Sequence, residues 1–357
     1  MSFITGILFV VGIVLLIWGA DLLVRGSAHL AAMIGISPLI IGLTVVALGT
    51  SAPEFAVSVR AVLIGQADLT LGNVIGSNIA NVLLILGLAA LVAPLLVAPR
   101  VLQREVPMMI AASLLLWLLA SDGHIGRLDG IVLVVLLVVF LLTTVLSARQ
   151  GPAEQQTVVS KRPLRNRRTI LQNLGLIALG LALLALGAQW LVDGAVSFAR
   201  SLGISELIIG LTVVAVGTSL PEIATSVLAS LRGEREIAVG NVVGSNILNI
   251  LAVLGLTALF APAPIAVPNS ALAFDLPVMT VVAVACLPIF FNGRMIARWE
   301  GGLFLGYYIA YTLYLLLSAT QAANLRIFSV AMLTFVIPLT IVTLIVITAR
   351  NVRRLRS

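Results

Sequence analysis

The chain has 357 residues, of which 61% are hydrophobic and only 10% are charged. This composition excludes a soluble domain, because a folded chain of this length cannot hide so many apolar side chains from water. The net charge of +7 does not indicate nucleic-acid binding, since aromatic residues do not interleave with the basic ones and basic loops are typical of membrane proteins. The single cysteine, Cys286, excludes an intrachain disulfide and a thiolate metal cluster.

Apolar segments long enough to cross a bilayer core of about 30 Å as helices recur along the whole chain. We expect eleven such helices, near residues 4–33, 38–64, 70–93, 105–120, 128–148, 171–199, 206–231, 238–260, 272–291, 301–319 and 327–349. The first one is interpreted as a retained membrane helix and not a signal peptide, because no Lys or Arg precedes it and it includes Asp21 and Arg25.

Two long segments of the sequence are repeated at a constant offset of 168 residues. GISPLIIGLTVVALGTSAPEF at 35–55 is closely similar to the segment at 203–223, and GNVIGSNIANVLLILG at 72–87 is closely similar to the segment at 240–255. This similarity indicates an internal duplication. Because each half has five helices, an odd number, the second half must enter the membrane in the opposite orientation.

The predicted fold is therefore an all-α membrane protein with an inverted repeat of two five-helix halves and an eleventh C-terminal transmembrane helix. The expected divisions are a first half at 1–148, a basic cytoplasmic linker at 149–169, a second half at 170–320, and the extra helix with a basic tail at 321–357. With the N-terminus outside, 16 of the 21 Lys and Arg residues lie on the inner side. The C-terminus is then cytoplasmic, and the short loops indicate a prokaryotic inner membrane.

One repeated motif places a carboxylate in the middle of a membrane helix. GTSAPE at 49–54 and GTSLPE at 217–222 each interrupt an apolar segment. Proline has no N–H and clashes with the carbonyl four residues earlier, so each helix should break there and free carbonyl groups. Glu54 and Glu222 are costly in a bilayer, and no basic residue lies at a similar depth, so a cation or a proton should compensate each charge. A simple proline kink satisfied by Thr and Ser hydroxyls is the alternative, but it does not explain a glutamate in both copies.

The second repeated motif forms a polar stripe. Every fourth residue is polar in each copy: Asn73, Ser77 and Asn81, and then Asn241, Ser245 and Asn249. This spacing places each set on one helical face. Facing the two carboxylates, the stripes would complete an all-oxygen site of the kind that Ca²⁺ and Na⁺ prefer. The alternative is polar contact between helices, which fits Asn78 and Asn246 better because they point away from the stripe.

Four further polar residues lie in the first and sixth helices: Asp21, Arg25, Gln189 and Asp193. They are expected to form an ion pair across the two halves or, alternatively, a gate between two states. The sequence contains no Ser-His-Asp arrangement and no Walker loop, so an enzyme is not expected. Energy would then come from an ion gradient, or the protein would be a passive pathway.

The paired motifs GTSAPE with GNVIGSNIAN and GTSLPE with GNVVGSNILN resemble the alpha-repeats of the calcium/cation antiporter superfamily, and most closely its prokaryotic sodium/calcium exchanger branch. The resemblance covers the first ten helices, up to about residue 320. It implies ion sites between two inverted halves, with first and sixth helices that slide to switch access. Carried over by motif, the implied ligands are the backbone of Ala47 and Ala215 and the side chains of Thr50, Ser51, Glu54, Ser77, Asn81, Thr218, Ser219, Glu222, Ser245 and Asn249.

The resemblance implies a secondary antiporter that exchanges Ca²⁺ for Na⁺ or H⁺ across the lipid bilayer by alternating access. Glu54, Glu222, Thr50 and Thr218 would hold the metal ion, with no cofactor besides the transported ions. Many relatives have an Asp where this chain has Asn249, so only two acidic ligands remain here. Two carboxylates neutralise one Ca²⁺, two Na⁺ or two protons. Monovalent cation/proton antiport and a passive cation channel are therefore open alternatives.

Overall fold

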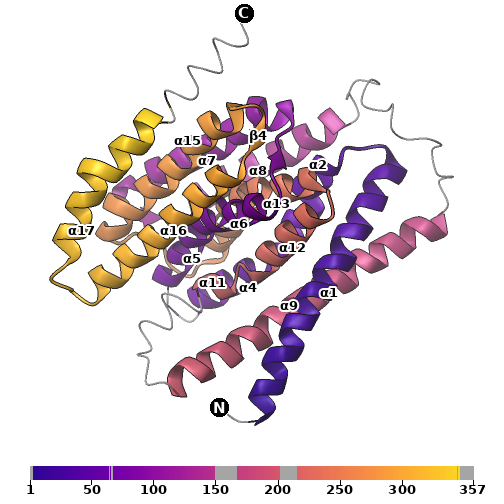
Figure 1. The fold of residues 1–357 in the computed structure, drawn as a ribbon, viewed down its shortest axis with the longest axis horizontal. Helices are drawn as coiled ribbons and strands as arrows, with labels where there is room; N and C mark the ends of the chain where they lie inside the picture. The colour runs from indigo at the N-terminus through magenta and orange to yellow at the C-terminus, as the bar shows by residue number, and fades with distance from the viewer. Residues whose placement is uncertain are drawn as a thin grey trace, which may run out of the picture.

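The computed structural model describes residues 3–148 except positions 64 and 66, residues 167–201, and residues 215–345 except position 344. Nearly all of the described chain is helical, which confirms the predicted all-α class (Figure 1). The predicted linker lies outside the described residues apart from positions 167–169, as do positions 206–214 of the seventh predicted helix and the basic tail.

The helices are interrupted by short π-helical or 3-10 segments, marked η, and by two-residue strands. The first half contains α1 (Phe3–Ile34), α2 (Pro38–Ile41), η1 (Gly42–Val46), α3 (Ala47–Thr50), α4 (Ala52–Leu63), α5 (Ala67–Ala80), η2 (Asn81–Leu86), α6 (Gly87–Val92), β1 (Leu95–Leu96), η3 (Val101–Glu105), α7 (Val106–Leu119), η4 (Ala120–Asp122), β2 (His124–Ile125) and α8 (Arg127–Ala148).

The second half repeats this order where the structure describes it. It contains α9 (Arg167–Ser201), α11 (Ala215–Gly217), α12 (Leu220–Leu231), α13 (Arg235–Leu248), η7 (Asn249–Leu254), α14 (Gly255–Phe260), β3 (Ile265–Ala266), η8 (Ala271–Asp275), α15 (Leu276–Phe291), β4 (Met295–Ile296) and α16 (Arg298–Ala319). The chain continues with α17 (Leu325–Ala331) and η9 (Met332–Val336).

Nine helices within the described residues are long and apolar enough to cross a membrane. The second predicted helix is a bent pair in which segments Pro38–Thr50 and Ala52–Leu63 meet at 41°, and it makes a tenth candidate crossing when the pair is taken as one span. The seventh is described only over its last part, Leu220–Leu231. The apolar helix Leu325–Thr343 corresponds to the eleventh predicted one and packs beside α16 in Figure 1. Its crossing of the membrane stays a prediction.

Elements of the first half pair with elements of the second half in opposite directions. Strand β1 pairs antiparallel with β4, and β2 pairs antiparallel with β3. Helices α1 and α9 cross in the same way, since Gly12 lies against Gly187 and Gly19 lies against Gly180. Residue numbers that rise along one helix and fall along its partner define an antiparallel pair. The two halves are therefore inverted relative to each other, as predicted.

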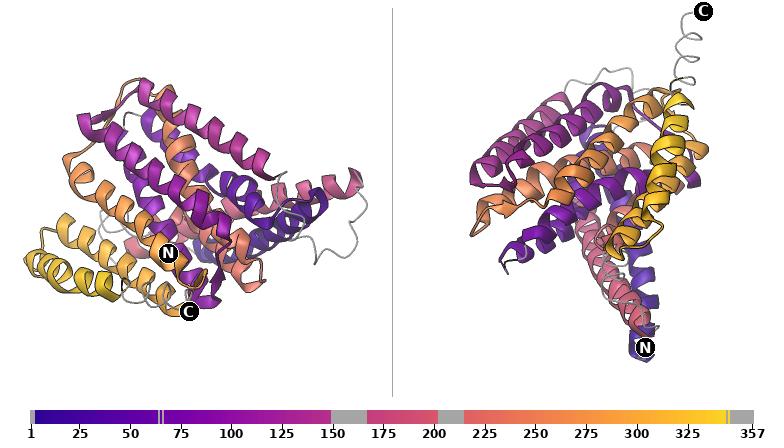
Figure 2. Two further views of the ribbon diagram at one scale, coloured as in Figure 1. Left: turned by 90° about the horizontal axis from the view of Figure 1, so that it is seen from above. Right: turned by 90° about the vertical axis from the view of Figure 1, so that its left-hand side faces the viewer.

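The crossing of α1 and α9 depends on glycine. A Cβ atom on Gly12 would lie 2.9 Å from the carbonyl oxygen of Gly187, and one on Gly180 would lie 2.7 Å from that of Gly19. Backbones approach this closely only where small residues allow it. The crossed pair lies along one side of the helix bundle and extends beyond it (Figure 1, Figure 2).

The centre of the molecule is formed by two continuous helical rods, one from each half. The first runs through α5, η2 and α6, and the second through α13, η7 and α14. Their most apolar windows are 78% and 89% buried, against 33% for α1 and 28% for α9. The two rods are therefore surrounded by protein, whereas α1 and α9 leave most of their surface to the lipid.

The α1–α9 pair does not sit symmetrically on the bundle. Helix α1 packs along α12, but α9 makes no comparable contact with α4, the equivalent of α12, in the described part of the chain. Asp21 of α1 forms an ion pair with Arg232, at the end of α12, and accepts a second ion pair from Arg25 at 3.0 Å. An ion pair across the halves exists, but it joins Asp21 to Arg232, which is not among the four predicted residues, and Arg25 pairs within its own helix.

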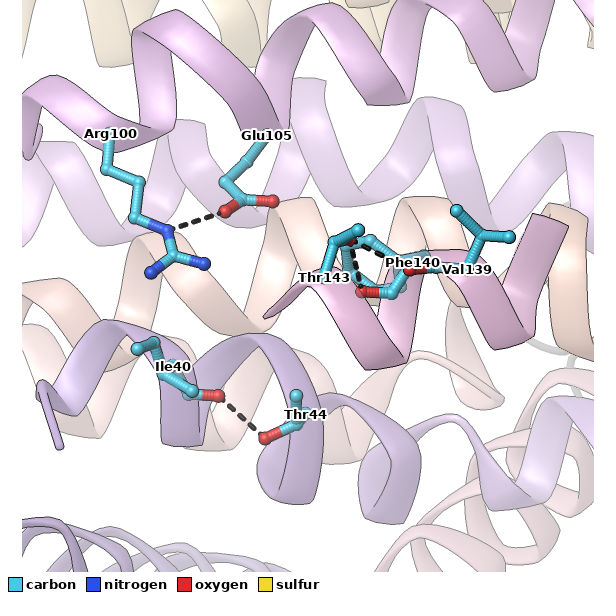
Figure 3. Close-up of polar contacts among 7 residues, drawn as sticks. All are labelled: Ile40, Thr44, Arg100, Glu105, Val139, Phe140 and Thr143. Carbon is cyan, nitrogen blue, oxygen red and sulfur yellow. Dashed lines mark hydrogen bonds and ion pairs between the residues drawn. The ribbon is translucent and has the colours of Figure 1, made fainter. Parts of the chain in front are cut away.

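Polar side chains away from the centre mostly find local partners. Arg100 Nε lies 3.0 Å from Glu105 Oε1, and the Thr44 hydroxyl donates to the carbonyl of Ile40 at 2.6 Å (Figure 3). The Thr143 hydroxyl donates to backbone carbonyls one turn earlier on α8. Such pairing removes most of the penalty of placing these groups at membrane depth.

Candidate functional site

Both GTS(A/L)PE motifs interrupt their helices, as predicted. Helix α3 ends at Thr50 and α4 begins at Ala52, while α11 ends at Gly217 and α12 begins at Leu220. The proline in each restarted helix has no N–H to give, so the carbonyl four residues earlier lacks its helical partner. Each restart also places a glutamate in the first turn of a new helix, where the helix dipole stabilises negative charge.

The two glutamates meet at the interface between the repeats. The Ser51 hydroxyl donates to Glu222 Oε1 at 3.4 Å, and the Ser219 hydroxyl donates to Glu54 Oε1 at 3.4 Å. Both glutamate side chains are only 1% exposed, and they are close enough to interact electrostatically. Each repeat therefore supplies one carboxylate and the hydroxyl that contacts the carboxylate of the other repeat.

The first asparagine of each stripe supports a broken helix. Asn73 donates from Nδ2 to the carbonyl of Glu54 at 3.1 Å and to the Ser58 hydroxyl at 3.0 Å. Asn241 donates to the Ser226 hydroxyl at 2.9 Å and accepts from the Thr50 hydroxyl at 3.1 Å. These amides fasten the restarted helices to the central rods.

The second residue of each stripe is a buried serine. Ser77 lies 3.5 Å from the Ser219 hydroxyl, which also contacts Glu54, so this serine reaches the carboxylate region. Its counterpart Ser245 is fully buried and its hydroxyl makes no hydrogen bond among the described residues. Both predicted serines therefore lie at the centre of the molecule.

The last residue of each stripe contacts the opposite repeat through its amino group. Asn81 Nδ2 donates to Asn246 Oδ1 at 3.1 Å, and Asn249 Nδ2 donates to Asn78 Oδ1 at 3.2 Å. The side-chain oxygens Oδ1 of Asn81 and Asn249 are buried and make no hydrogen bond among the described residues. The sequence analysis assigned Asn78 and Asn246 only to contacts between helices. Their recurrence in both repeats was the signal that could have singled them out.

The predicted ligands account for most of the unpaired buried oxygens. Among the described residues, eight buried side-chain oxygens lack a hydrogen bond, and five belong to predicted ligands: Glu54 Oε2, Glu222 Oε2, Asn81 Oδ1, Asn249 Oδ1 and Ser245 Oγ. Each unpaired buried polar group costs about 1–3 kcal/mol. Atoms that only accept are the ones a hard cation coordinates. These five atoms belong to the two repeated motifs, which also carry the two carboxylates.

The remaining predicted ligands lie at the two breaks. The carbonyl of Ala47 accepts the Ser51 N–H at 3.0 Å and the Thr50 hydroxyl at 3.4 Å. Thr50 is buried and Thr218 is partly buried at the equivalent turn. Ala215 is the first described residue after α9, and its side chain is not described.

Neither glutamate forms an ion pair with Lys or Arg within the described part of the chain, and no group of three or more His, Cys, Asp or Glu side chains is present there. Two carboxylates surrounded by neutral oxygens can balance one divalent cation or two monovalent ones. A helical membrane protein of two inverted repeats, with such oxygens where the repeats meet, has the architecture of a secondary transporter for cations.

Comparison with known proteins supports the assignment of the chain to a class of cation transporters. Residues 4–146 and 172–317 match the family described as sodium/calcium exchanger protein. The chain is 44% identical to the inner membrane protein YrbG of Escherichia coli, over 78% of this chain and 86% of that protein. It is 33% identical to the sodium/calcium exchanger MaX1 of Methanosarcina acetivorans, over 85% of this chain and 96% of that one.

Among solved structures, the sodium-calcium exchanger NCX_Mj soaked with 10 mM Na⁺ and no Ca²⁺ is similar, with a TM-score of 0.74 and 33% identity over 86% of this chain and 97% of that one. The chain belongs to the sodium/calcium exchanger family. Proteins of this family are transporters, so the chain is an integral membrane protein that exchanges cations.

Proposed function

We propose that this protein is a secondary antiporter that exchanges Ca²⁺ for Na⁺ or H⁺ by alternating access. The observation that carries the proposal is the pair of buried glutamates at the repeat interface, each with one carboxylate oxygen unpaired. Two negative charges without a basic partner need positive charge from ions that enter the site. One Ca²⁺, two Na⁺ or two protons supply it, and competition among them for the same oxygens couples their movements.

The proposed ligands are the twelve residues implied by the motifs. They are Glu54, Glu222, Thr50, Thr218, Ser51, Ser219, Ser77, Ser245, Asn81, Asn249 and the backbone of Ala47 and Ala215. For Ca²⁺, the glutamates and the two threonines are the proposed metal ligands. Ca²⁺ takes 6–8 oxygen ligands, so a set drawn from both repeats is large enough to replace its water shell.

Alternating access is supported by the unequal contacts of α1 and α9. In an inverted repeat, exchanging the roles of the two halves turns an arrangement open to one side into one open to the other. Here α1 packs along α12 while α9 lacks the equivalent contact with α4 in the described residues. We infer that the two arrangements are interchanged when the α1–α9 pair moves across the bundle, with its glycine-lined crossing intact.

The proposed orientation has the N-terminus outside and the C-terminus in the cytoplasm of a prokaryotic cell, in the inner membrane. It rests on the charge distribution, because basic loops stay on the cytoplasmic side. The proposed divisions are halves at 1–148 and 170–320, a cytoplasmic linker at 149–169, and a peripheral helix and tail at 321–357.

Proton-coupled or purely monovalent exchange is a second candidate, favoured by Asn249. The side chain of Asn249 is a neutral amide, whose amino group donates to Asn78, so it brings no third negative charge. Three Na⁺ would leave a net positive charge on a site with two carboxylates, which is unfavourable in a low-dielectric interior. Coupling to two monovalent ions or two protons per Ca²⁺ avoids that charge.

Uptake of ⁴⁵Ca²⁺ into proteoliposomes tests the proposal. One set of vesicles is loaded with Na⁺ and diluted into Na⁺-free medium, and a matched set carries only a pH gradient. Saturable uptake driven by either gradient is expected, and the effective gradient identifies the counter-ion. Sodium-driven pH change in vesicles that accumulate no Ca²⁺ would instead establish monovalent cation/proton exchange.

Asp275→Asn is the matched control, because Asp275 is a carboxylate on a membrane helix whose contact with the Tyr311 hydroxyl an asparagine can keep. It should leave uptake near wild type, while Glu54→Gln or Glu222→Gln should abolish it. Uptake that needs no counter-ion and shows single-channel steps would contradict exchange and indicate a passive channel.

A further inference from the structure

We propose that Asn78 and Asn246 are positioning residues that fix the amide orientation of Asn249 and Asn81. Each would hold the amino group of its partner so that the carbonyl oxygen of that partner is turned to the ion. This inference rests on the proposed function, because it assigns residues that prepare the same site.

The chemistry of the amide makes orientation decisive. An asparagine side chain carries an oxygen that accepts and an NH₂ group that donates, on opposite sides of one planar group. A cation is coordinated only by the oxygen. If Asn81 or Asn249 turned by half a rotation, it would present two N–H groups to the cation, and a ligand would become a source of repulsion.

Hydrogen bonds across the repeats oppose this rotation. Asn249 Nδ2 donates to Asn78 Oδ1 at 3.2 Å, and Asn81 Nδ2 donates to Asn246 Oδ1 at 3.1 Å. The two bonds are equivalent under the 168-residue offset, which relates Asn78 to Asn246 and Asn81 to Asn249. Rotating either ligand would bring its oxygen against the oxygen of its partner.

The positioning residues are themselves fixed. Asn78 Nδ2 donates to the carbonyl of Asn246 at 3.2 Å and contacts Met279 Sδ at 3.7 Å. Asn246 Nδ2 contacts Met109 Sδ at 3.2 Å. With these amino groups engaged, the oxygen of each positioning residue is turned to the ligand amide. Both are nearly fully buried, at 3% and 2% exposure, so water does not compete for these bonds.

The segments that carry the two unpaired amide oxygens pack against the helices that carry the glutamates. Asn81 Oδ1 and Asn249 Oδ1 are buried without a hydrogen bond. Segment η2, which begins at Asn81, packs against α12, which carries Glu222, and η7, which begins at Asn249, packs against α4, which carries Glu54. Each oriented oxygen therefore lies in the neighbourhood of the carboxylate of the other repeat.

A double-mutant cycle tests the inference on the full-length protein in proteoliposomes. Asn78→Leu removes the acceptor and keeps a similar volume, and Asn78→Ala removes it without adding bulk should the leucine variant fail to fold. Either change should raise the half-saturating Ca²⁺ concentration about tenfold, with a smaller effect on the maximal rate. In the Asn249→Ala background, the same change should add less than about twofold, because the group that it positions is gone.

Two comparisons separate positioning from a general loss of packing. Asn173→Leu is the matched control, because Asn173 is also buried and donates to a methionine sulfur and a backbone carbonyl, but far from the site on α9. It should leave half-saturation unchanged. Asn78→Leu combined with Asn81→Ala should give nearly additive effects, because Asn81 is oriented by the other positioning residue.

The result that would overturn positioning is a penalty for Asn78→Leu that is equal with and without Asn249, or no change in half-saturation while wild type takes up Ca²⁺. The same double-mutant cycle is also measured with Na⁺ as the transported ion. The positioning role is then tested in the same way if the protein carries only Na⁺. Wild-type protein that binds neither ion would overturn both this inference and the proposed function.

Discussion

The central rods and the α1–α9 pair differ in how deeply they are buried and in how their helices contact each other. The rods are 78% and 89% buried over their apolar windows and carry the asparagines and serines of both stripes, most of them held by hydrogen bonds across the repeats. The α1–α9 pair is only 33% and 28% buried over the same measure, and its two helices contact each other through glycine backbones. The rods thus hold polar atoms in fixed positions, whereas α1 and α9 contact each other through closely approaching glycine backbones.

The difference separates two tasks that a transporter must perform. Ion selectivity requires oxygens that keep their positions, and a buried hydrogen-bonded network provides this rigidity. Switching access requires elements that move without breaking such a network. The comparison predicts that changes in the rods alter ion affinity, and that changes in the α1–α9 pair alter the rate of exchange.

The largest effect that separates the two regions is expected for Gly180→Val. Its side chain would meet the backbone of Gly19 and Leu23, both within 2.8 Å of an added Cβ atom, and would force the crossing apart. We expect the exchange rate to fall at least about tenfold while the purified protein keeps near wild-type Ca²⁺ affinity. Gly175→Val is the control, because an added Cβ there meets nothing within 4 Å. Loss of Ca²⁺ binding in Gly180→Val would remove the separation of tasks.

A smaller effect is expected for Ser51→Ala and Ser219→Ala. Each variant removes a hydroxyl that contacts the glutamate of the other repeat at 3.4 Å, and it leaves the charges intact. The half-saturating Ca²⁺ concentration should rise about three- to tenfold in each, because one neutral ligand and one hydrogen bond are lost. Uptake titrations measure this. Wild-type half-saturation in both variants would contradict their place in the site.

Asp21→Asn should have a modest effect, confined to rate. It removes the ion pairs with Arg232 and Arg25, of which Arg25 is half exposed, so each pair contributes little. Because the pair with Arg232 fastens α1 to α12, its loss should change the initial uptake rate by up to about threefold at unchanged half-saturation. Asp122→Asn, on an exposed loop, is the control. An altered affinity in Asp21→Asn would place this residue in the ion site.

The smallest effect is expected on removing residues 321–357. Helix segment Leu325–Thr343 is 0% buried over its apolar window, and Tyr307 of α16 contacts it at Val336 and Thr340. Uptake per folded protein should stay within about twofold of wild type. A complete loss of uptake by a truncated protein that still elutes as a folded species would show that this helix takes part in transport.

The sequence predicted the fold to the extent that local chemistry determines it. Proline in each GTS(A/L)PE motif indicated the breaks after Thr50 and Gly217, and the constant offset of the repeats indicated the inverted halves. Both follow from the residues themselves, because a proline removes one hydrogen bond of its helix and favours a kink or a break there. The meeting of Glu54 and Glu222 could be expected from the same symmetry.

Contacts that depend on how helices are placed against each other could not be predicted in the same way. The sequence placed Arg25 and Asp193 among the candidates for an ion pair across the halves. The structure instead pairs Asp21 with Arg232, because α1 lies along α12. The roles of Asn78 and Asn246 likewise require the distance between two rods of opposite direction. A helical stripe shows which residues share a face, and it does not show what that face meets.

The most direct test of the account is Ca²⁺ binding to purified protein by isothermal titration calorimetry, with Glu54→Gln and Glu222→Gln measured separately against wild type and Asp275→Asn. Both glutamine variants keep the volume of the side chain and one accepting oxygen, and they remove one of the two charges. The account predicts that each loses Ca²⁺ affinity by at least about 100-fold, and by similar factors because the two positions are equivalent. Wild-type affinity in either variant would contradict a site shared between the two repeats.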